Sequence, residues 1–313
     1  MQRVSIIITT HNRPGLLSRA VESARLSGRD AEIVVVDDAS TDETVEVCRS
    51  LQGVRYIRNE RRQGVARARN VGLRASSCEY IGFLDDDDER LPGSLDMQVE
   101  QLEAEPRAGM IYGQALIVGG GEPGAQQLYP KHCPRGDIFW ELLEQNFIPC
   151  GSAVFRRSCL MSVGLLDESV PGIDDWDLWL RMAERFNVTA TEQPVYGWRR
   201  SSPGSGQGSS SGARMVRMAV RQFRERWTRL DRAAHAPRSA RRAAWRAFSE
   251  GMARHLVWEA VRAQRAGRTR QAAENIFTGL RLLPYAMLRV PFDRRRARAA
   301  FGLLRGLASA RRA

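Results

Sequence analysis

The sequence has 313 residues, of which 43% are hydrophobic and 27% charged, which suits one large or two modest folded domains and excludes an intrinsically disordered chain. Its net charge of +12 is uneven, because residues 214–313 hold 25 Arg against six acidic residues, or +19, which leaves −7 for residues 1–213. No apolar run reaches the roughly 18 residues of a membrane-spanning helix, so we expect no segment that crosses a bilayer.

The first hundred residues alternate between strand-like and helix-like stretches. The runs VSIIITT (4–10) and EIVVVDD (32–38) are continuous and β-branched, as in strands that are covered on both faces. Further strand-like runs lie at 54–59 and 79–88, and the helix-like stretches lie at 11–27, 40–51 and 64–76. This order predicts a right-handed, mostly parallel, doubly wound α/β sheet.

Beyond about residue 105 the pattern changes, and shorter, mixed elements are expected. These are a strand pair at 108–120, a short helix at 136–145, an extended piece at 150–158 and a helix at 174–186, whose Trp176, Trp179, Leu180 and Ala183 form an inward stripe. The Ser- and Gly-rich stretch 201–212 is predicted to be a flexible loop or linker, which puts the domain boundary near residue 213. The Arg/Ala-rich remainder is helix-forming, with breaks at Pro237, Pro284 and Pro291.

The predicted strands of the first half end in polar groups, in the sequences TTHN, DDAS, RN and DDDD. Ligands of open parallel sheets bind beyond the carboxyl ends of strands, so three such ends on one edge favour a binding site. No GxGxxG follows the first strand and the sequence contains no GxxxxGK[ST], so a Gly-rich phosphate loop is not expected. The aspartates at 85–88 either form a solvated turn that caps the next helix or hold Mg²⁺ or Mn²⁺ against a diphosphate, because these ions prefer carboxylate oxygens.

Several motifs together carry a resemblance to a known family. They are VSIIITTHNRP, EIVVVDDASTDET, GVARARNVGL and YIGFLDDDD, followed later by VGLLDESVPGIDDWDLWLRM. In this order and spacing, over residues 3–105 and again over 163–182, the chain resembles the family 2 glycosyltransferases with the GT-A fold. The resemblance implies a GT-A domain over 1–213, with a nucleotide-sugar-binding half (1–105) and an acceptor and catalytic-base half (106–213), followed by a basic helical region (214–313).

The resemblance also implies an activity. It is that of an inverting transferase that moves a sugar from a nucleoside-diphosphate sugar, with a UDP-sugar the expected donor, to an acceptor hydroxyl in bacterial surface glycan or glycoconjugate synthesis. The acceptor stays open among a saccharide, a lipid-linked saccharide and a peptide. Two other functions remain as alternatives, a nucleotidyltransferase and a non-catalytic sugar-nucleotide-binding protein.

The donor-side residues implied by the resemblance lie at the strand ends. Asp85 and Asp87 of the DxD motif would hold Mg²⁺ or Mn²⁺ as the cofactor. The residues implied to bind the nucleotide sugar are Thr9, His11, Asp38 (with Asp37 as the alternative), Arg69 (with Arg67 as the alternative) and Asp86. Asp88 is expected to cap the following helix instead.

The catalytic base implied by the resemblance is Asp175, in the acidic pair that opens the helix at 174–186. The family has Glu at the position of Asp174, and the second acid of its pair deprotonates the acceptor hydroxyl during a single inverting displacement. The alternative is that these acids only favour the positive N-terminus of a helix.

The sequence departs from the family after this helix. Ser202 stands where many relatives have a His that joins the metal or diphosphate site, and a serine cannot replace imidazole as a strong ligand. Arg199 and Arg200 are expected to contact the diphosphate instead, through paired hydrogen bonds. The stretch 201–212 would then be a lid that orders on donor binding, or a plain linker.

The remaining features concern compartment and partners. The five cysteines have no CxxC spacing, which argues against a disulfide framework or a zinc site. Because the N-terminus also lacks a signal-peptide pattern, we expect a cytoplasmic protein. The stretch 266–292 mixes arginines with leucines as an interfacial amphipathic helix does, so peripheral contact with the inner face of the cell membrane is a hypothesis, beside a helical packing domain or an oligomer interface. Nucleic acid is not expected as a partner, because the first two thirds are acidic and lack a recognition motif.

Overall fold

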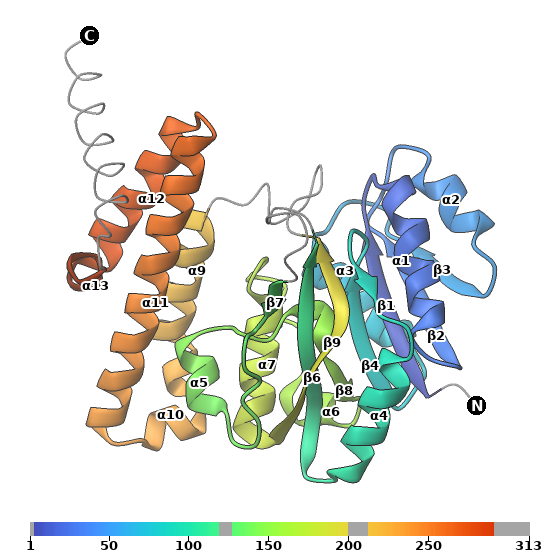
Figure 1. Cartoon of the computed structure of the whole chain (residues 1–313), viewed down its shortest axis with the longest axis horizontal. Coiled ribbons are helices and arrows are strands. Elements are labelled where there is room, and N and C mark those ends of the chain that lie inside the picture. The colour runs from blue at the N-terminus through green and yellow to red at the C-terminus, as the bar shows by residue number, and fades with distance from the viewer. Residues whose placement is uncertain (1–2, 119–126, 200–211, 291–313) are drawn as a thin grey trace. The chain divides into compact units, whose positions relative to one another are not determined.

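The computed structural model describes residues 3–118, 127–199 and 212–290. The chain divides into two compact units (Figure 1). The sheet unit comprises residues 1–142 and 146–205, and the helical unit comprises residues 143–145 and 206–313. The main division, between 205 and 206, falls slightly before the boundary that the sequence predicts near residue 213.

The sheet unit is built on one mixed sheet. Within the described residues its strands are β1 (Val4–Thr10), β2 (Ala31–Asp37), β3 (Val54–Arg58), β4 (Tyr80–Asp85), β5 (Glu89–Arg90), β6 (Ala108–Val118), β7 (Gln127–Tyr129), β8 (Val154–Arg156) and β9 (Asn187–Arg199). Their order is β3-β2-β1-β4-β8-β6-β9-β5, with β7 beside β6. The first four strands of the chain pair in parallel, so their carboxyl ends meet at one edge, as predicted.

The described part of the predicted strand pair at 108–120, residues 108–118, is a single strand, β6. β6 pairs antiparallel with β7 and β8 and parallel with β9. Gly113, in the middle of β6, does not form a turn: a Cβ there would lie 2.7 Å from Cγ1 of Val195 on β9. The glycine therefore allows two strands to approach closely, and a pattern of alternating residues cannot distinguish that role from a turn.

Seven α-helices and the 3₁₀ helix η1 (Cys150–Ser152) are described up to residue 199. The α-helices are α1 (Pro14–Leu26), α2 (Thr44–Ser50), α3 (Val65–Ala75), α4 (Ser94–Ala104), α5 (Phe139–Glu144), α6 (Cys159–Val163) and α7 (Asp174–Arg185). α2 is shorter than the predicted 40–51, because Asp42 accepts a 3.0 Å hydrogen bond from the backbone N–H of Thr44 and forms a turn before the helix. α7 matches its prediction, and its predicted stripe of Trp176, Trp179, Leu180 and Ala183 is buried.

The helix α3 packs closely on the sheet and so positions residues near the strand ends. A Cβ on Gly72 of α3 would lie 2.3 Å from Cγ2 of Ile7, which is fully buried in β1. This contact leaves no room for a side chain between helix and strand. Arg69, one turn earlier on α3, is thereby held at the carboxyl end of the sheet.

The helical unit consists of helices within its described residues. They are α9 (Gly212–Glu225), the 3₁₀ helix η2 (Trp227–Arg229), α10 (Asp231–His235), α11 (Arg238–Arg265), α12 (Thr269–Leu282) and α13 (Pro284–Arg289). Pro237 precedes α11 and Pro284 opens α13, as predicted, whereas Pro291 lies outside the described residues. Among the described residues no helix is long and apolar enough to span a membrane.

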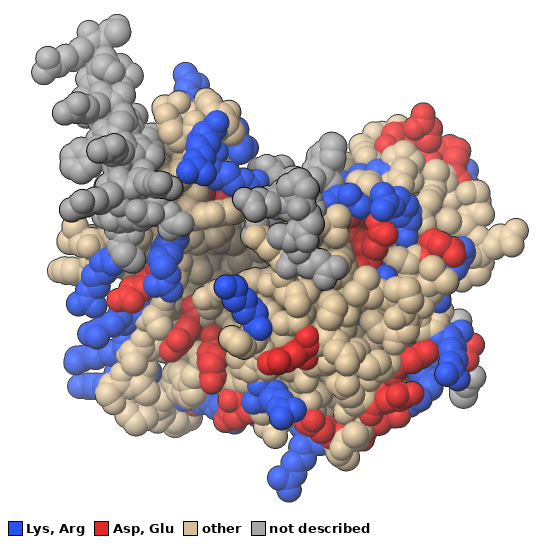
Figure 2. Space-filling model, in the orientation of Figure 1, with Lys and Arg blue, Asp and Glu red and all other residues tan. Residues whose placement is uncertain are grey.

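Within its described residues the stretch 266–292 forms two helices, α12 and α13, with the predicted break at Pro284. Leu283 separates α12 from α13 and is buried, whereas Leu280 and Leu288 are exposed. The apolar residues of this stretch therefore divide between a packed interior and an exposed surface. Figure 2 shows basic side chains gathered over the part of the helical unit where α11 and α13 lie.

Candidate active site

Three carboxylates lie together beyond the end of β4. Asp85 is the last residue of β4 and is in register with Thr9 of β1. One carboxylate oxygen each of Asp85, Asp87 and Asp88 lies within 4.8 Å of the other two. Such oxygens are the ligands that Mg²⁺ and Mn²⁺ prefer, so this cluster is a candidate metal centre.

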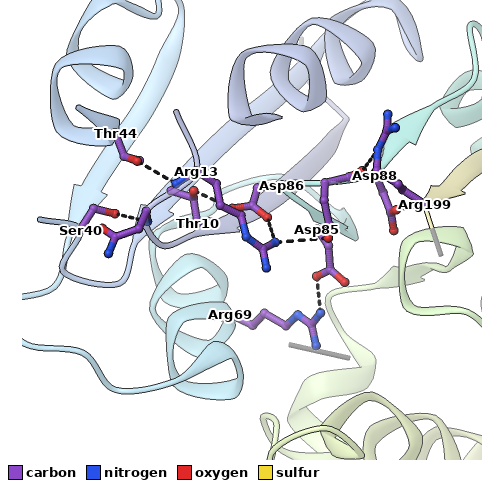
Figure 3. Close-up of polar contacts among 11 residues, drawn as sticks. Thr10, Arg13, Ser40, Thr44, Arg69, Asp85, Asp86, Asp88 and Arg199 are labelled. Atoms are coloured by element: carbon purple, nitrogen blue, oxygen red, sulfur yellow. Dashed lines mark hydrogen bonds and ion pairs between the residues drawn. The ribbon is translucent and has the colours of Figure 1, made fainter. Parts of the chain in front are cut away.

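Asp88 belongs to this cluster and does not cap a helix, so that expectation was wrong. The two residues after it form β5, and α4 begins only at Ser94. Its carboxylate accepts a 2.7 Å hydrogen bond from the backbone N–H of Arg199 on β9 (Figure 3). Burial, together with the negative charge of Asp85, raises the pKa of Asp88 to about 9. The charges of the cluster repel one another, so the donor set fits a divalent cation.

Asp86 faces a different partner. It is buried and accepts hydrogen bonds from Thr10 Oγ1 (2.7 Å) and from Arg13 Nη1 (2.6 Å). Burial raises the pKa of Asp86 to about 6, although the charge of Arg13 opposes this shift. The same Nη1 lies 3.3 Å from Asp87 Oδ2, so one guanidinium contacts two aspartates of the motif (Figure 3). Arg13 was not predicted as a site residue, because its only signal in the sequence is its place three residues after a strand end.

The aspartates at the end of β2 already have internal partners. Asp38 accepts hydrogen bonds from Asn59 Nδ2 (2.9 Å) and from the backbone N–H groups of Gln63 (2.9 Å) and Gly64 (2.7 Å). Asp37 accepts from the backbone N–H of Ser40 (2.8 Å) and from the Tyr56 hydroxyl (3.0 Å), and it pairs with Arg58 (3.3 Å). Asp38 thus fixes the loop that leads into α3, and its contact with a nucleotide base stays a prediction.

His11 lies just beyond β1 with an unsatisfied ring nitrogen. Its Nδ1 is buried and has no hydrogen-bond partner among the described residues. A buried polar atom without a partner is costly, and a bound ligand would remove that cost. Thr9, the other predicted residue of this strand end, is buried beside Asp85.

Arg69 links the metal cluster to the start of α7. Its Nη2 lies 2.6 Å from Asp85 Oδ1 and its Nη1 lies 2.8 Å from Asp174 Oδ2. The guanidinium is buried, and its central carbon lies 5.5 Å from the centroid of the Phe83 ring. The structure thus pairs Arg69 with two carboxylates, whereas the resemblance implied a phosphate contact.

Asp175 is the member of the acidic pair in the first turn of α7 that has no ion pair with Arg69. Asp174 is held by Arg69 and by the backbone N–H of Gly172 (3.0 Å), whereas Asp175 accepts a hydrogen bond from the backbone N–H of Trp176 (2.7 Å). Burial and, after it, the charge of Asp174 raise the pKa of Asp175 to about 7, against the opposing effect of Arg69. A carboxylate with such a pKa can accept a proton near neutral pH.

The segment after β9 is described only in part. Ser202, Arg200 and the predicted lid or linker at 201–212 lie outside the described residues, apart from Gly212, which begins α9. Arg199 is described, and it braces the acidic turn: its Nε donates to the carbonyl of Asp87 (3.1 Å) and its Nη2 lies 3.2 Å from Glu89.

Sequence comparison decides the family. The family model described as Glycosyl transferase family 2 matches residues 5–164. This chain belongs to glycosyl transferase family 2. A family 2 relative from Escherichia coli, UDP-Glc:alpha-D-GlcNAc-diphosphoundecaprenol beta-1,3-glucosyltransferase WfaP, is 35% identical over 190 residues, which are 59% of this chain and 72% of that protein. GalNAc(5)-diNAcBac-PP-undecaprenol beta-1,3-glucosyltransferase from Campylobacter jejuni is 37% identical over 123 residues, which are 37% of this chain and only 39% of that protein.

Structural comparison agrees with this membership. The mannosyltransferase PcManGT from Pyrobaculum calidifontis, solved in complex with GDP-Man and Mn²⁺, shares the fold with a TM-score of 0.54 at 21% identity, over 89% of this chain and 87% of that chain. At such identity the likeness concerns the fold alone. The predicted GT-A fold with a C-terminal helical region is confirmed.

Proposed function

We propose that this family 2 member is a metal-dependent inverting glycosyltransferase that moves a sugar from a UDP-sugar to a hydroxyl of a lipid-linked saccharide in bacterial surface glycan synthesis. The names of the two bacterial relatives, both acting on undecaprenol-linked saccharides, support the acceptor, and one of them supports UDP. The observation that carries the proposal is the contact chain Asp85–Arg69–Asp174, which joins the carboxylate cluster to the helix that carries Asp175.

On the donor side, Asp85, Asp87 and Asp88 would hold Mg²⁺ or Mn²⁺. When bound, the ion offsets the negative charge that builds on the departing diphosphate. The residues proposed to contact the nucleotide sugar are Thr9, His11, Asp38, Arg69 and Asp86. Arg13 and Arg69 supply positive charge beside the cluster, because each contacts a carboxylate at the end of β4.

On the acceptor side, Asp175 would take the proton of the acceptor hydroxyl. The oxygen attacks the anomeric carbon while the bond from that carbon to the diphosphate oxygen breaks, and the nucleoside diphosphate leaves with the bonding electrons. One displacement of this kind inverts the anomeric configuration. Asp174, tied to Arg69 and Gly172, holds the start of α7 in place and leaves the proton transfer to Asp175.

A lipid-linked acceptor would place this reaction at a membrane surface. We therefore propose a cytoplasmic protein in peripheral contact with the inner face of the cell membrane. This part of the proposal rests on the acceptor class and on the basic charge of residues 214–313.

The test compares the variants Asp175→Asn and Asp87→Ala with the wild type in a donor-hydrolysis assay with Mn²⁺. Loss of a general base should lower kcat by about 10²- to 10⁴-fold. Asp87→Ala should raise the Mn²⁺ concentration for half-maximal rate by about tenfold or more. The control is Asp96→Asn, at a partly exposed carboxylate on α4 that pairs with Arg29, and it should keep the wild-type rate. Wild-type turnover in both site variants would refute the mechanism.

A further inference from the structure

The helical unit contains a basic pocket of its own. The cavity has a volume of about 830 Å³ and is lined by residues from α9, η2, α11 and α13. Six arginines lie on its walls, at Arg224, Arg238, Arg241, Arg242, Arg246 and Arg289. The lining also includes three aromatic residues, Phe223, Trp245 and Tyr285. We call this cavity the arginine pocket.

The charges of the arginine pocket are not balanced by the described part of the chain. Glu250 is the one acidic residue among the described lining residues, and it already pairs with Arg289 at 3.4 Å. Over residues 3–118, 127–199 and 212–290, no carboxylate pairs with Arg238, Arg241, Arg242 or Arg246. Cations held together without counter-charges repel one another, so an anion bound among them would stabilise the unit.

The position of three of these arginines adds to the imbalance. Arg238, Arg241 and Arg242 lie in the first five residues of α11, a helix of 28 residues. The first turn of α11 has no acidic residue, and the residue before it, Pro237, makes no side-chain capping bond. A helix N-terminus is itself positive, so cations there are unfavourable and an anion is favoured.

The pocket also offers apolar surface to a ligand. The Phe223 and Trp245 rings pack with their centroids 5.1 Å apart, and the Arg224 guanidinium lies 4.9 Å from the Trp245 ring centroid. On α13, Tyr285 is 83% exposed and lines the pocket, and nearby Leu288 is 79% exposed. Arginines bind phosphate through paired hydrogen bonds, while exposed aromatic and leucine side chains insert at the boundary between lipid headgroups and acyl chains.

We propose that the arginine pocket binds a phosphate group carried on an apolar body, as in the headgroup of an anionic membrane phospholipid. Up to three guanidinium groups from the start of α11 would contact the phosphate, and Tyr285 and Leu288 would enter the lipid. The site lies wholly within the helical unit, so its test is independent of the transferase chemistry.

The test uses the full chain and flotation with vesicles of phosphatidylcholine, with or without phosphatidylglycerol. The pocket variant is R238Q/R241Q/R242Q. Its control, R265Q/R268Q/R270Q, removes the same charge from exposed arginines around the other end of α11, about 40 Å along the helix. The pocket variant should lose about 100-fold in partition to anionic vesicles, at about tenfold or less per arginine, and the control should lose far less.

Two further measurements separate the sources of phosphate and the effect of folding. Tyr285→Ala should weaken vesicle binding but leave thermal stabilisation by inorganic diphosphate unchanged, both measured with a chelator so that no cation holds diphosphate at the carboxylate cluster of the sheet unit. If no vesicle binds but diphosphate stabilises the wild type and the control and not the pocket variant, the site binds soluble phosphate esters. The proposal would be overturned if the two triple variants lost equal amounts of vesicle binding. It would also be overturned if the wild type, shown by circular dichroism to be folded, responded neither to anionic vesicles nor to diphosphate.

Discussion

Arg69 is the residue on which the geometry of the active site most depends. It is buried between Asp85 and Asp174, and removing one partner of a buried ion pair leaves an uncompensated charge that costs about 3–5 kcal/mol. We expect Arg69→Met to lower the free energy of unfolding by about 3 kcal/mol, because Asp174 is buried whereas Asp85 is partly solvated. Urea unfolding measures this loss. Arg69→Lys keeps the charge but cannot contact both carboxylates, so its free energy of unfolding should lie between those of the wild type and Arg69→Met. An Arg69→Met variant as stable as the wild type would show that Arg69 does not stabilise the fold through these ion pairs.

The raised pKa of Asp175 predicts opposite effects of pH on activity and on stability. Only its carboxylate form can accept a proton, so kcat should rise as pH increases through about 7. For stability, the folded state holds the proton more tightly than the unfolded state, whose pKa is near 3.8, so the contribution of Asp175 is lost as pH rises from about 4 to above 7. Asp175→Asn should therefore melt above the wild type at pH 8. A pH-independent rate between 6 and 8 would contradict this assignment.

The residues of the site divide into those that sequence reasoning could find and those it could not. Asp85 and Asp87 stand at a strand end and Asp175 at a helix start, which are positions local in sequence, and the family resemblance implied their roles, which stay predictions. Arg13 meets Asp86 because β1 pairs with β4, and Asp88 meets Arg199 because β5 pairs with β9. Tertiary contacts of this kind leave no periodic signal in the sequence.

At the scale of elements, α3 sets the distance between the sheet and the active site. Gly72→Ala would place a Cβ 2.3 Å from Cγ2 of Ile7, and overpacking of this kind costs about 1–3 kcal/mol, against a gain of up to about 1 kcal/mol in helix propensity. We expect a lower Tm and, because Arg69 shifts with the helix, a lower kcat. Gly15→Ala in α1 has nothing within 4 Å of the new Cβ, so it should keep or slightly raise the Tm and leave kcat unchanged. An equal Tm for the two alanine variants would show that α3 is not tightly fixed.

The elements also show how far a pattern in the sequence predicts structure. The runs that became β1, β2 and β4 were found because buried parallel strands are continuously apolar. β6 was mistaken for a strand pair because Gly113 serves close packing against β9 and not a turn. The break at Pro284 between α12 and α13 was predicted, but the burial of Leu283 at that break was not, because it depends on tertiary packing.

For the whole molecule, the uneven charge corresponds to two units with different chemistry. The sheet unit gathers carboxylates at the carboxyl edge of its parallel strands, and the helical unit gathers arginines at the start of α11. The composition predicted this division, but the pocket in the helical unit depends on how α9, α11 and α13 pack. The carboxylates are central to the proposed activity, because a diphosphate can bind beside them only with a cation between.

The most direct measurement is therefore calorimetric binding of UDP to the wild type with Mn²⁺ and with a chelator in its place. We expect Mn²⁺ to lower the Kd by about tenfold or more, and Asp85→Asn and Asp88→Asn to lose most of that gain. Equal Kd values with and without Mn²⁺ in a folded wild type that binds UDP would show that the aspartates at the end of β4 do not hold a metal against the diphosphate.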